Sequence, residues 1–452
     1  KIGSLPDMYL GLPLCLSKPK IEDFVPMLKR IESRLLCCST MLSTGDKLTL
    51  LKSVFTSLPT FIMCTLEIPE TVIKQINTYL MDCFWRKFGT QERGMVNISW
   101  DVVCKAKDQG GLGVLDLNVH NQALLIKFIH KFFNRVDIPW VNIIWETHYQ
   151  DNKLPGQELV GSFWWKCNLR LIDSYKSMAR CTIGDGKSAL FWSDLWHTSC
   201  LNQLFPHLYS FVRDQNLSVQ KVIMFEYLED LFHPPLTREA FLEFELMEEI
   251  CDTLRRSAFN DHLDTWSYMW GNSTFSVAKA YKILIGVKIV PAQFNWIWKS
   301  SAQPKHKVFF WRLLHDRLNT RNLLRRKTFH LDNYNCATLN CQQEETLQHL
   351  FWTCPFASAC WDILCPNRQR NLSIMEAIPD LRSDLHQPFS MEIIIIASWA
   401  IWIVRNDKIF NSIPTSIHRW KFIFLTKLHL LKFRIKEKFS ASFCSWLDTL
   451  VL

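Results

Sequence analysis

The segment CATLNCQQEETLQHLFWTC, residues 336–354, places three cysteines and one histidine in the spacing C-x4-C-x7-H-x4-C. Three thiolates and one neutral imidazole suit a closed tetrahedral Zn²⁺ site, which leaves no coordination position for water. The segment therefore predicts one structural zinc ion, bound by Cys336, Cys341, His349 and Cys354. Pro355 follows the last ligand directly, and a proline there is typical of the first turn of a helix.

The alternative is that some of these four side chains are ordinary buried residues, because the chain contains 16 cysteines. The cysteines elsewhere, such as Cys37, Cys38, Cys64 and Cys104, stand in apolar or isolated settings. Four ligands within 19 residues favour the metal site over chance. An ion with four protein ligands has no open position for a substrate, so we expect it to stabilise the fold rather than to catalyse a reaction.

The composition favours a helical protein with several domains. Of the 452 residues, 48% are hydrophobic, and only 14 are glycine, which argues for helices rather than a turn-rich sandwich. We expect a mainly α fold with small β elements (α+β). The net charge of +9 weakly favours an anionic partner, since the excess is small for this length.

Metal-binding thiols must stay reduced, which indicates an intracellular compartment, nuclear or cytoplasmic. The longest apolar run, residues 393–404, is shorter than the roughly 20 residues that a membrane-spanning helix needs. We therefore expect no membrane partner, and no motif indicates a small-molecule substrate. Because residue 1 is Lys and not Met, we expect the chain to be a piece of a longer reading frame.

Hydrophobic periodicity at three- and four-residue steps marks several helices. It predicts helices over residues 20–57, 71–88, 118–133, 391–411 and 419–439. Asp46 is expected to cap a helix over residues 47–58. A short extended segment is expected to end at Pro13, and residues 367–388 are interpreted as a polar connector. The helix over residues 419–439 is basic and amphipathic; packing against the preceding helix is favoured over a nucleic-acid or membrane surface.

Three polar stretches suggest ligand binding and are better explained as structure. The run Gly110-Gly-Leu-Gly113 fits neither nucleotide-binding glycine pattern, so it predicts a tight turn followed by a short strand. The triplet Gly184-Asp-Gly186 lies within the alternating segment 180–192, which predicts a β-hairpin. The carboxylates in residues 243–249 alternate with apolar residues, which favours a solvated helix face over a metal site.

A cluster of cations precedes the cysteine segment. Basic residues beside a zinc module are a plausible contact for the phosphate backbone of a nucleic acid, although a solvated helix face explains them about equally well on composition alone. The residues predicted to contact nucleic acid are Lys305, Lys307, Arg312, Arg317, Arg321, Arg325, Arg326 and Lys327. Thr320 is expected to cap the helix that carries the later members.

The order of several motifs along the chain resembles plant LINE-type (non-LTR) retrotransposon reverse transcriptases, in the portion that follows the palm. The motifs are YLGLPL at 9–14, FW at 84–85, GGLG at 110–113, NQALLIK at 121–127, IGDGK at 183–187, FWSDLW at 191–196, FPHL at 205–208, DTWSYMW at 264–270, FSVAKAY at 275–281 and WAIWIVRND at 399–407. The resemblance spans nearly the whole chain, and the cysteine segment corresponds to the reverse transcriptase zinc-binding domain.

The resemblance implies four regions: a helical thumb-like region at 1–150, a Trp-rich connector at 151–290, the zinc-binding domain at 291–366 and C-terminal helices at 367–452. It also implies RNA or DNA as a partner. Such polymerases hold two metal ions on palm carboxylates that include an Asp-Asp pair, and no such pair occurs in this sequence. We therefore expect a fragment of an RNA-directed DNA polymerase that is not itself an enzyme. A zinc-stabilised protein-interaction module and a decayed retroelement relic are the alternatives.

Overall fold

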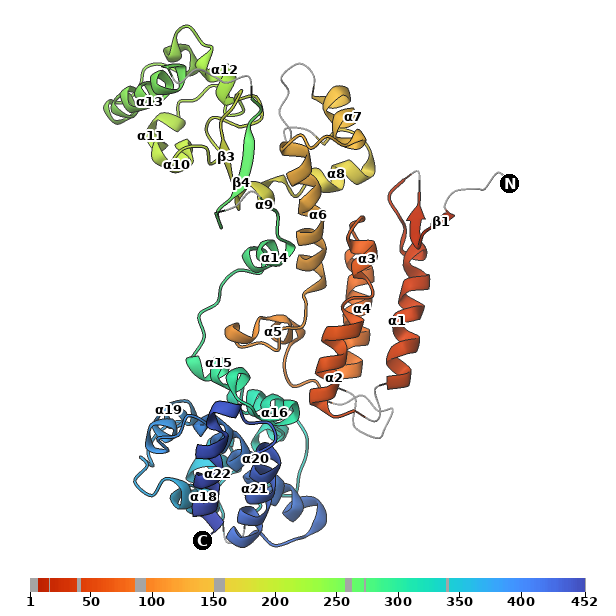
Figure 1. The fold of residues 1–452 in the computed structure, drawn as a ribbon, viewed down its shortest axis with the longest axis vertical. Coiled ribbons are helices and arrows are strands. Elements are labelled where there is room, and N and C mark those ends of the chain that lie inside the picture. Colours follow the sequence, from red (N-terminus) through yellow and green to blue (C-terminus); the bar gives the residue numbers. More distant parts are fainter. Residues whose placement is uncertain are drawn as a thin grey trace. The chain divides into compact units, whose positions relative to one another are not determined.

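The computed structural model describes residues 7–15, 17–38, 42–85, 95–149, 159–256, 262–271, 274–338 and 341–451 (Figure 1). Helices make up most of this part, and its strands form two antiparallel sheets of two strands each, β1 with β2 and β3 with β4. The expected mainly α fold with small β elements is confirmed.

The chain divides into two compact units, each assembled from three stretches. Unit 1 takes in Lys1–Pro26, Pro59–Lys74 and Leu117–Val287, and unit 2 takes in Met27–Leu58, Gln75–Asp116 and Lys288–Leu452. The four regional boundaries inferred from sequence stay a prediction. No helix among the described residues is long and apolar enough to cross a membrane.

Unit 1 combines both sheets with short helices. Its elements are β1 (Asp7–Tyr9), β2 (Leu12–Leu14), α3 (Thr60–Met63), α6 (Leu117–Phe133), α7 (Pro139–His148), α8 (Phe163–Leu169), α9 (Ile172–Lys176), β3 (Ala179–Thr182), α10 (Leu201–Leu204), α11 (Pro206–Tyr209), α12 (Val219–Ile223), η4 (Leu228–Leu231), α13 (Arg238–Arg256), β4 (Thr265–Tyr268) and α14 (Val277–Ile285). Helix α6, expected at 118–133, is confirmed.

The first sheet is a hairpin rather than the single extended segment expected to end at Pro13. Strands β1 and β2 pair across a turn at Leu10 and Gly11, both with positive φ, and Pro13 lies inside β2 opposite Met8. A two-stranded ribbon has only edge strands, so the missing N–H of a proline is tolerated there.

The second sheet corrects a further prediction. Strand β3 does not fold back on residues 187–192; it pairs with β4, with Ala179 opposite Tyr268 and Thr182 opposite Thr265. The two strands are about 85 residues apart in sequence, a pairing that local turn signals do not reveal.

The core of unit 1 is aromatic. Phe132 on α6 stacks on Trp145 with ring centroids 4.4 Å apart, and Phe133 lies 5.0 Å from Trp266 of β4. Trp165 and Trp266 are fully buried. The tryptophans that are frequent between residues 139 and 200 therefore serve in packing, where large rings contribute most apolar burial per residue.

Unit 2 is all helical in its described residues. Its elements are α1 (Val25–Cys38), α2 (Thr44–Leu50), η2 (Leu51–Phe55), most of α4 (Glu70–Trp85), α5 (Trp100–Cys104), η3 (Lys107–Gln109), α15 (Ala292–Lys299), α16 (Pro304–Leu314), α17 (Arg321–Arg326), η5 (His349–Thr353), α18 (Pro355–Leu364), α19 (Ile374–Asp384), α20 (Ser390–Asn411), α21 (Ile417–Leu431) and α22 (Glu437–Val451). A short η1 (Ile21–Phe24) precedes α1.

Three boundaries in unit 2 differ from expectation. Helix α2 begins at Thr44, because Ser43 accepts a hydrogen bond from the Asp46 amide and so acts as the cap that Asp46 was expected to be. Gly110 does form a tight turn with φ of 82°, but no strand follows it among residues 111–116. Helix α19 lies within the expected polar connector, started by a capping box of Ser373 and Glu376.

The C-terminal basic helix is two helices. The structure ends α21 at Leu431 and begins α22 at Glu437. Continuing the helix would place Lys432 above Lys436 and Arg434 above Lys438, and like charges four residues apart disfavour a helix. Helix α21 packs against α20, as expected.

Candidate metal centre

The four predicted ligands converge in unit 2. The Sγ atoms of Cys336, Cys341 and Cys354 and the nearer ring nitrogen of His349 all lie within 4.8 Å of one another. The Cys336 and Cys354 sulfurs are 3.9 Å apart, and the Cys341 sulfur is 3.1 Å from His349 Nε2. In the described part of the chain, this is the one group of three or more His, Cys, Asp and Glu side chains that close together.

Local backbone geometry explains how so short a segment gathers four ligands. The first two cysteines lie in a turn in which the Cys336 amide donates to Gln343 O at 2.8 Å and the Cys341 amide donates to Thr338 O. The π-helical turn η5 begins at His349, and the Cys354 amide closes it by donating to His349 O at 2.7 Å. Pro355 then starts α18, as predicted.

Two threonines outside the ligand spacing contact the ligand atoms. Thr338 Oγ1 lies 3.1 Å from the Cys336 sulfur and 3.2 Å from the Cys354 sulfur. Thr353 Oγ1 lies 3.3 Å from His349 Nδ1, which leaves Nε2 directed at Cys341. Contacts of this kind orient metal ligands and fix the histidine tautomer. The ligand spacing gave no signal for either threonine.

The sulfur pair favours negative charge at Cys354. A hydrogen bond from the Cys336 thiol, with further ones from His349 and Thr338, lowers the pKa of Cys354 to about 3. The same hydrogen bond raises the pKa of Cys336, and burial raises it further. One thiolate is therefore stabilised by its neighbours, and thiolates are the form that binds a metal.

The donor set and its spacing fit zinc. Ligands about 2.0–2.3 Å from a central ion at tetrahedral corners are about 3.5–3.8 Å from one another, close to the observed 3.9 Å between the sulfurs of Cys336 and Cys354. Cys336, His349 and Cys354 are buried and Cys341 is half-buried. Bound zinc would occupy a closed Cys₃His site, and its chemistry there would be structural.

A buried ion pair anchors this loop to α20. Glu345, fully buried within the ligand segment, accepts hydrogen bonds from Arg405 Nε at 3.2 Å and from Arg405 Nη2. Its Oε1 also accepts from the Arg321 amide at 2.9 Å. Truncating one partner of such a pair leaves the other charge buried without compensation. The sequence marked Arg405 only as part of a family-like motif, because its partner lies 60 residues away.

The Gly184–Gly186 turn in unit 1 binds the side chain of Asp264. The buried carboxylate of Asp264 accepts hydrogen bonds from the amides of Gly184, Gly186 and Ser188 and from Ser188 Oγ, each at 2.8 Å. A row of backbone amides of this kind is an anion-binding nest. An internal anion occupies it, which supports the interpretation that this glycine motif is not a nucleotide loop.

Intramolecular contacts engage most of the eight cations predicted to contact nucleic acid. Lys307 donates to the carbonyls of Trp298 and Ser300, and Lys327 donates to Val96 O and Asn97 Oδ1. Further partners are Asn335 O for Arg321, Glu344 for Arg325, Asp316 for Arg326, Asp316 O for Arg317 and the Trp85 ring for Arg312.

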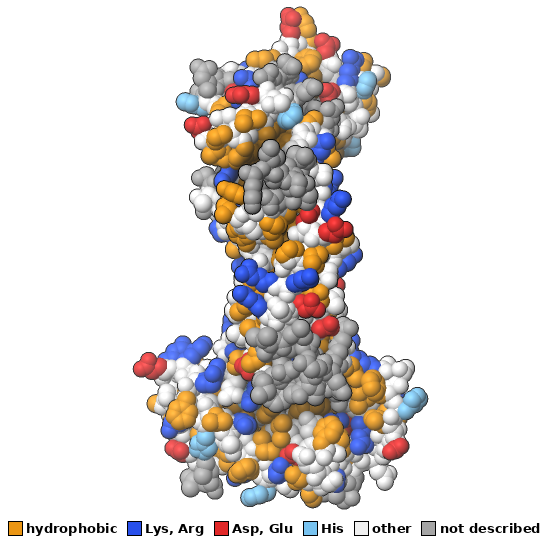
Figure 2. Space-filling model, turned by 90° about the vertical axis from the view of Figure 1, so that its right-hand side faces the viewer, with side chains coloured by type: hydrophobic (Ala, Val, Ile, Leu, Met, Phe, Trp, Pro, Cys, Tyr) orange, Lys and Arg blue, Asp and Glu red, His pale blue; other side chains and the backbone are white. Residues whose placement is uncertain are grey.

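Burial also makes two members of this set less accessible. It lowers the pKa of Lys307 to about 8 and that of Arg312 to about 10, values at which both side chains stay cationic at neutral pH. On the face shown in Figure 2, Lys and Arg side chains are interspersed with acidic and hydrophobic ones. Lys305 has no side-chain partner among the described residues. The structure thus gives seven of the eight residues internal roles, and their contact with nucleic acid stays a prediction.

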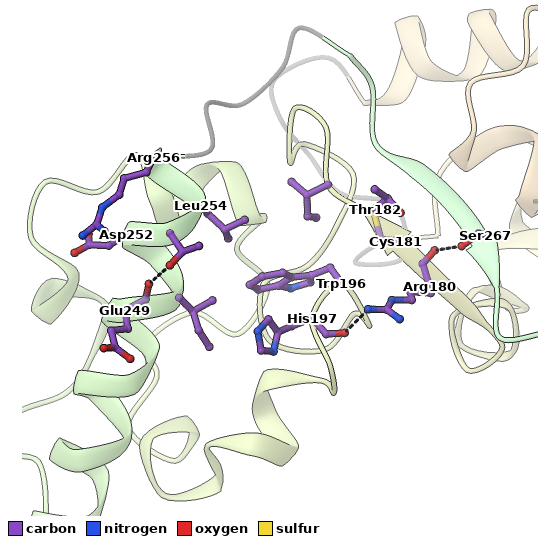
Figure 3. A pocket seen from close by; sticks show the side chains of 13 residues that line it. Arg180, Cys181, Thr182, Trp196, His197, Glu249, Asp252, Leu254, Arg256 and Ser267 are labelled. Carbon is purple, nitrogen blue, oxygen red and sulfur yellow. Dashed lines mark hydrogen bonds between the residues drawn. The ribbon is translucent and has the colours of Figure 1, made fainter. Parts of the chain in front are cut away.

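A cavity of unit 1 between α13 and the second sheet is a second place to look for chemistry. It measures about 840 Å³, and Figure 3 shows α13 on one side and β3 with β4 on the other, with Trp196 and His197 between them. Arg180 spans towards the His197 carbonyl. Glu249 and Asp252 line the α13 side, but they form no metal-holding group with His197. The cavity therefore carries no assigned reaction.

Comparison with known proteins agrees with the metal centre. Residues 275–361 match the family described as zinc-binding in reverse transcriptase, a stretch that contains all four ligands. Over this stretch, about a fifth of the chain, the protein is similar to the zinc-binding region of reverse transcriptases. A putative ribonuclease H protein of Arabidopsis thaliana is 23% identical over 441 residues, covering 91% of this chain and 68% of that protein. An uncharacterized mitochondrial protein of the same plant is 25% identical over 144 residues, covering 31% of this chain and 92% of that protein.

The matched stretch agrees with the sequence prediction in part. It overlaps the expected zinc-binding domain at 291–366 and begins 16 residues earlier, within the segment 275–281 that contributed to the resemblance. The expected zinc site thus has two supports, the family match and the converging ligands.

Proposed function

We propose that this chain is a non-catalytic part of a LINE-type (non-LTR) retrotransposon reverse transcriptase, in which structural zinc stabilises a region that binds RNA or DNA inside the cell. The observation that carries the proposal is the converged Cys₃His cluster within the stretch that matches reverse transcriptase zinc-binding regions. The order of motifs along the whole chain supports the LINE-type assignment, because it extends far beyond that stretch.

The non-catalytic assignment rests on the kinds of metal ligand present. Polymerisation and two-metal hydrolysis of nucleic acid both need carboxylates that converge on Mg²⁺. The one metal-holding group among the described residues consists of thiols and an imidazole, and the sequence contains no Asp-Asp pair. The name of the ribonuclease H relative therefore does not transfer a hydrolytic activity to this chain.

Exposed Trp and Phe side chains between residues 294 and 311 would favour the protein-interaction alternative. Phe294, Phe309, Phe310 and Trp311 are buried in unit 2, and the other two aromatic residues of this range, Trp296 and Trp298, are half-buried, with Arg382 and Lys107 over their rings. The structure therefore offers no observation that favours this alternative over nucleic-acid binding.

A primer-extension assay tests the non-catalytic assignment. The full chain, incubated with a primed RNA template, Mg²⁺ and nucleotides, is expected to add no nucleotide, while a known reverse transcriptase in parallel extends the primer. Incorporation by the purified chain would overturn the assignment.

A salt titration tests nucleic-acid binding. Binding of labelled RNA and DNA to the full chain, followed by fluorescence anisotropy, is expected to weaken steeply with salt, because each phosphate contact releases counterions. Absence of RNA and DNA binding at low salt, or binding insensitive to salt, would contradict the proposal.

A further inference from the structure

The turn between α21 and α22 gathers positive charge. Residues 427–438 contain five Lys and Arg side chains and one carboxylate, Glu437. Within the described part of the chain, none of the five makes an ion pair or a side-chain hydrogen bond. Lys438 lies over the Phe439 ring, and the other four are Lys427, Lys432, Arg434 and Lys436. Lys432, Arg434 and Lys436 are exposed, unlike most of the cations that precede the zinc ligands. Their charges are therefore available to an anion from outside.

An exposed aromatic ring lies among these cations. The Phe433 side chain is 85% exposed and stands between Lys432 and Arg434 in the turn. A single exposed apolar side chain is common on protein surfaces, and what distinguishes Phe433 is that cations flank it on both sides. The ring has no aromatic partner among the described residues, so both of its faces are open to a planar ligand.

The fold adds charge from a distant segment of unit 2. Helix α20 packs against both α16 and α21. Near the start of α16, burial and then the charges of Lys305, Lys427 and Arg434 lower the pKa of His306 to about 3. Lys427 on α21 and Arg434 in the turn therefore act on the same buried histidine as Lys305, one of the residues predicted to contact nucleic acid. Neither ring nitrogen of the buried His306 has a hydrogen-bond partner among the described residues.

We propose that Phe433, together with Lys427, Lys432, Arg434 and Lys436, forms a binding surface for single-stranded nucleic acid. The Phe433 ring stacks on an unpaired base, and the flanking cations contact the phosphates on either side. This inference rests on the proposed nucleic-acid binding and specifies where it occurs and which form of nucleic acid is bound.

The arrangement of apolar and charged groups favours a single strand over a membrane or a duplex. Membrane-surface helices present a continuous apolar face. The main apolar face of α21, with Trp420, Phe424 and Leu428, is buried, and the helix leaves only Phe422 and Leu430 exposed among its large apolar side chains. Phe433 instead alternates with charge, as in grooves that bind single strands. In a duplex the bases are already stacked on one another, so an exposed ring has no free base to contact.

Anisotropy with the zinc-loaded full chain tests the proposal. The probe is a fluorescein-labelled oligouridine of about 20 nucleotides, long enough to span several base and phosphate contacts. Phe433→Ala is expected to weaken its binding about tenfold, while binding of the same oligonucleotide annealed to its complement changes little. Lys432→Ala/Arg434→Ala is expected to lower the slope of log K against log salt by about 1.4, the value for two lost single-strand phosphate contacts.

Matched variants control for exposure and for charge. Phe410→Ala removes a ring that is 75% exposed at the end of α20, and Lys166→Ala/Arg170→Ala removes two exposed cations from unit 1. Both are expected to bind the oligouridine as the unaltered chain does. Circular dichroism of each variant shows whether its helices are retained.

The outcomes distinguish the proposed Phe433 surface from the more general proposal that the chain binds nucleic acid. If the unaltered chain binds RNA and the Phe433 and Lys432/Arg434 variants bind it equally well, the surface is wrong and the proposed function stands. If the unaltered chain binds no RNA or DNA, both fall. If Phe433→Ala instead reduces sedimentation with phosphatidylserine vesicles and leaves RNA binding intact, the surface serves a membrane and the inference is overturned.

Discussion

The loop at residues 336–354 and the turn at residues 183–188 both bring together polar groups that suit a charged ligand. The first suits a cation from outside the chain, and the second binds an anionic side chain of the chain itself. In the first loop, three sulfurs and an imidazole converge in a way that suits a metal cation from outside the chain. In the turn, three amides and a hydroxyl converge on the carboxylate of Asp264, which belongs to the chain itself.

The difference teaches how to interpret ligand-like motifs. Both segments look like binding sites in the sequence, one by its cysteines and the other by its glycines. The cysteine loop keeps its ligand requirement after folding, because its four donor atoms converge and its neighbours stabilise the thiolate of Cys354. The glycine turn has its requirement met internally, because folding brings Asp264 from 76 to 80 residues away. A binding motif is therefore a candidate site only where the fold leaves it without an internal ligand.

Removal of the metal should produce the largest difference between the two loops, because only the cysteine loop depends on it. Zinc contributes an apparent folding free energy of about 10–16 kcal/mol in zinc-finger peptides, so chelation or Cys341→Ser should open the segment around residues 336–365. Hydrogen–deuterium exchange is expected to rise there, while the amides of the 183–188 turn stay protected. Metal analysis should find one zinc per unaltered chain.

A cysteine outside the cluster provides the control for this experiment. Cys444 is half-buried on α22 and takes no part in the ligand group. Cys444→Ser is expected to keep one zinc and the exchange pattern of the unaltered chain. Purified protein without zinc, or a Cys341→Ser variant with unchanged exchange, would refute the structural role of the metal.

Substitution of Asp264 should destabilise the turn at residues 183–188. Asp264→Asn keeps the size of the side chain but turns one acceptor into a donor that faces buried donors. Hydrogen bonds to a charged group contribute about 1.5–3 kcal/mol, so we expect the free energy of unfolding of unit 1 to fall by about 3 kcal/mol. A lower urea midpoint and faster exchange at residues 183–188 would report it, with no loss of zinc.

Asp185 in the same turn is the matched control. Its carboxylate accepts from the Lys187 amide and lies 3.5 Å from the half-exposed Lys187 ammonium. Surface pairs of this kind contribute about 0–1 kcal/mol, so Asp185→Asn should have little effect. Equal effects of the two substitutions would show that the amides do not depend on Asp264.

Acid should lower the free energy of unfolding of unit 2 through the buried His306, and this effect should be smaller than the previous two. The pKa of the buried His306 is about 3 in the folded chain and about 6.5 when unfolded, so the unfolded state takes up the proton first as pH falls. His306 therefore does not reduce the free energy of unfolding above pH 6.5, and its protonation in the unfolded state reduces that free energy progressively as the pH falls towards 3. The loss at pH 5 amounts to about 2 kcal/mol for this residue.

His306→Leu should remove this part of the acid sensitivity. The difference in free energy of unfolding between pH 7 and pH 5 is expected to be about 2 kcal/mol smaller in the variant than in the unaltered chain. Zinc release in acid affects both proteins, so the comparison isolates the histidine. Equal pH dependence of the two proteins would refute the assignment.

Much of the fold could be predicted where the signals were local. Helices α6 and α20 follow from apolar periodicity, and the starts of α17 and α18 follow from the cap Thr320 and from Pro355. Helix α19 also had a local signal, the Ser373–Glu376 capping box, which sequence analysis passed over because the surrounding residues are polar. The pairing of β3 with β4 had none, since two four-residue strands do not specify a distant partner.

The sequence by itself determined the metal ligands, because a site built within 19 residues needs only local turns to close. It also determined the helical character, which depends on the spacing of apolar residues. Only the tertiary structure decided which polar groups remain available. It assigned Asp264 to the glycine turn, Glu345 to Arg405 and most of the predicted cations to internal partners, and it left Phe433 in water. The reason is that contacts between residues far apart in sequence depend on how the core packs. The local sequence pattern around a polar group does not specify which distant side chain will bind it.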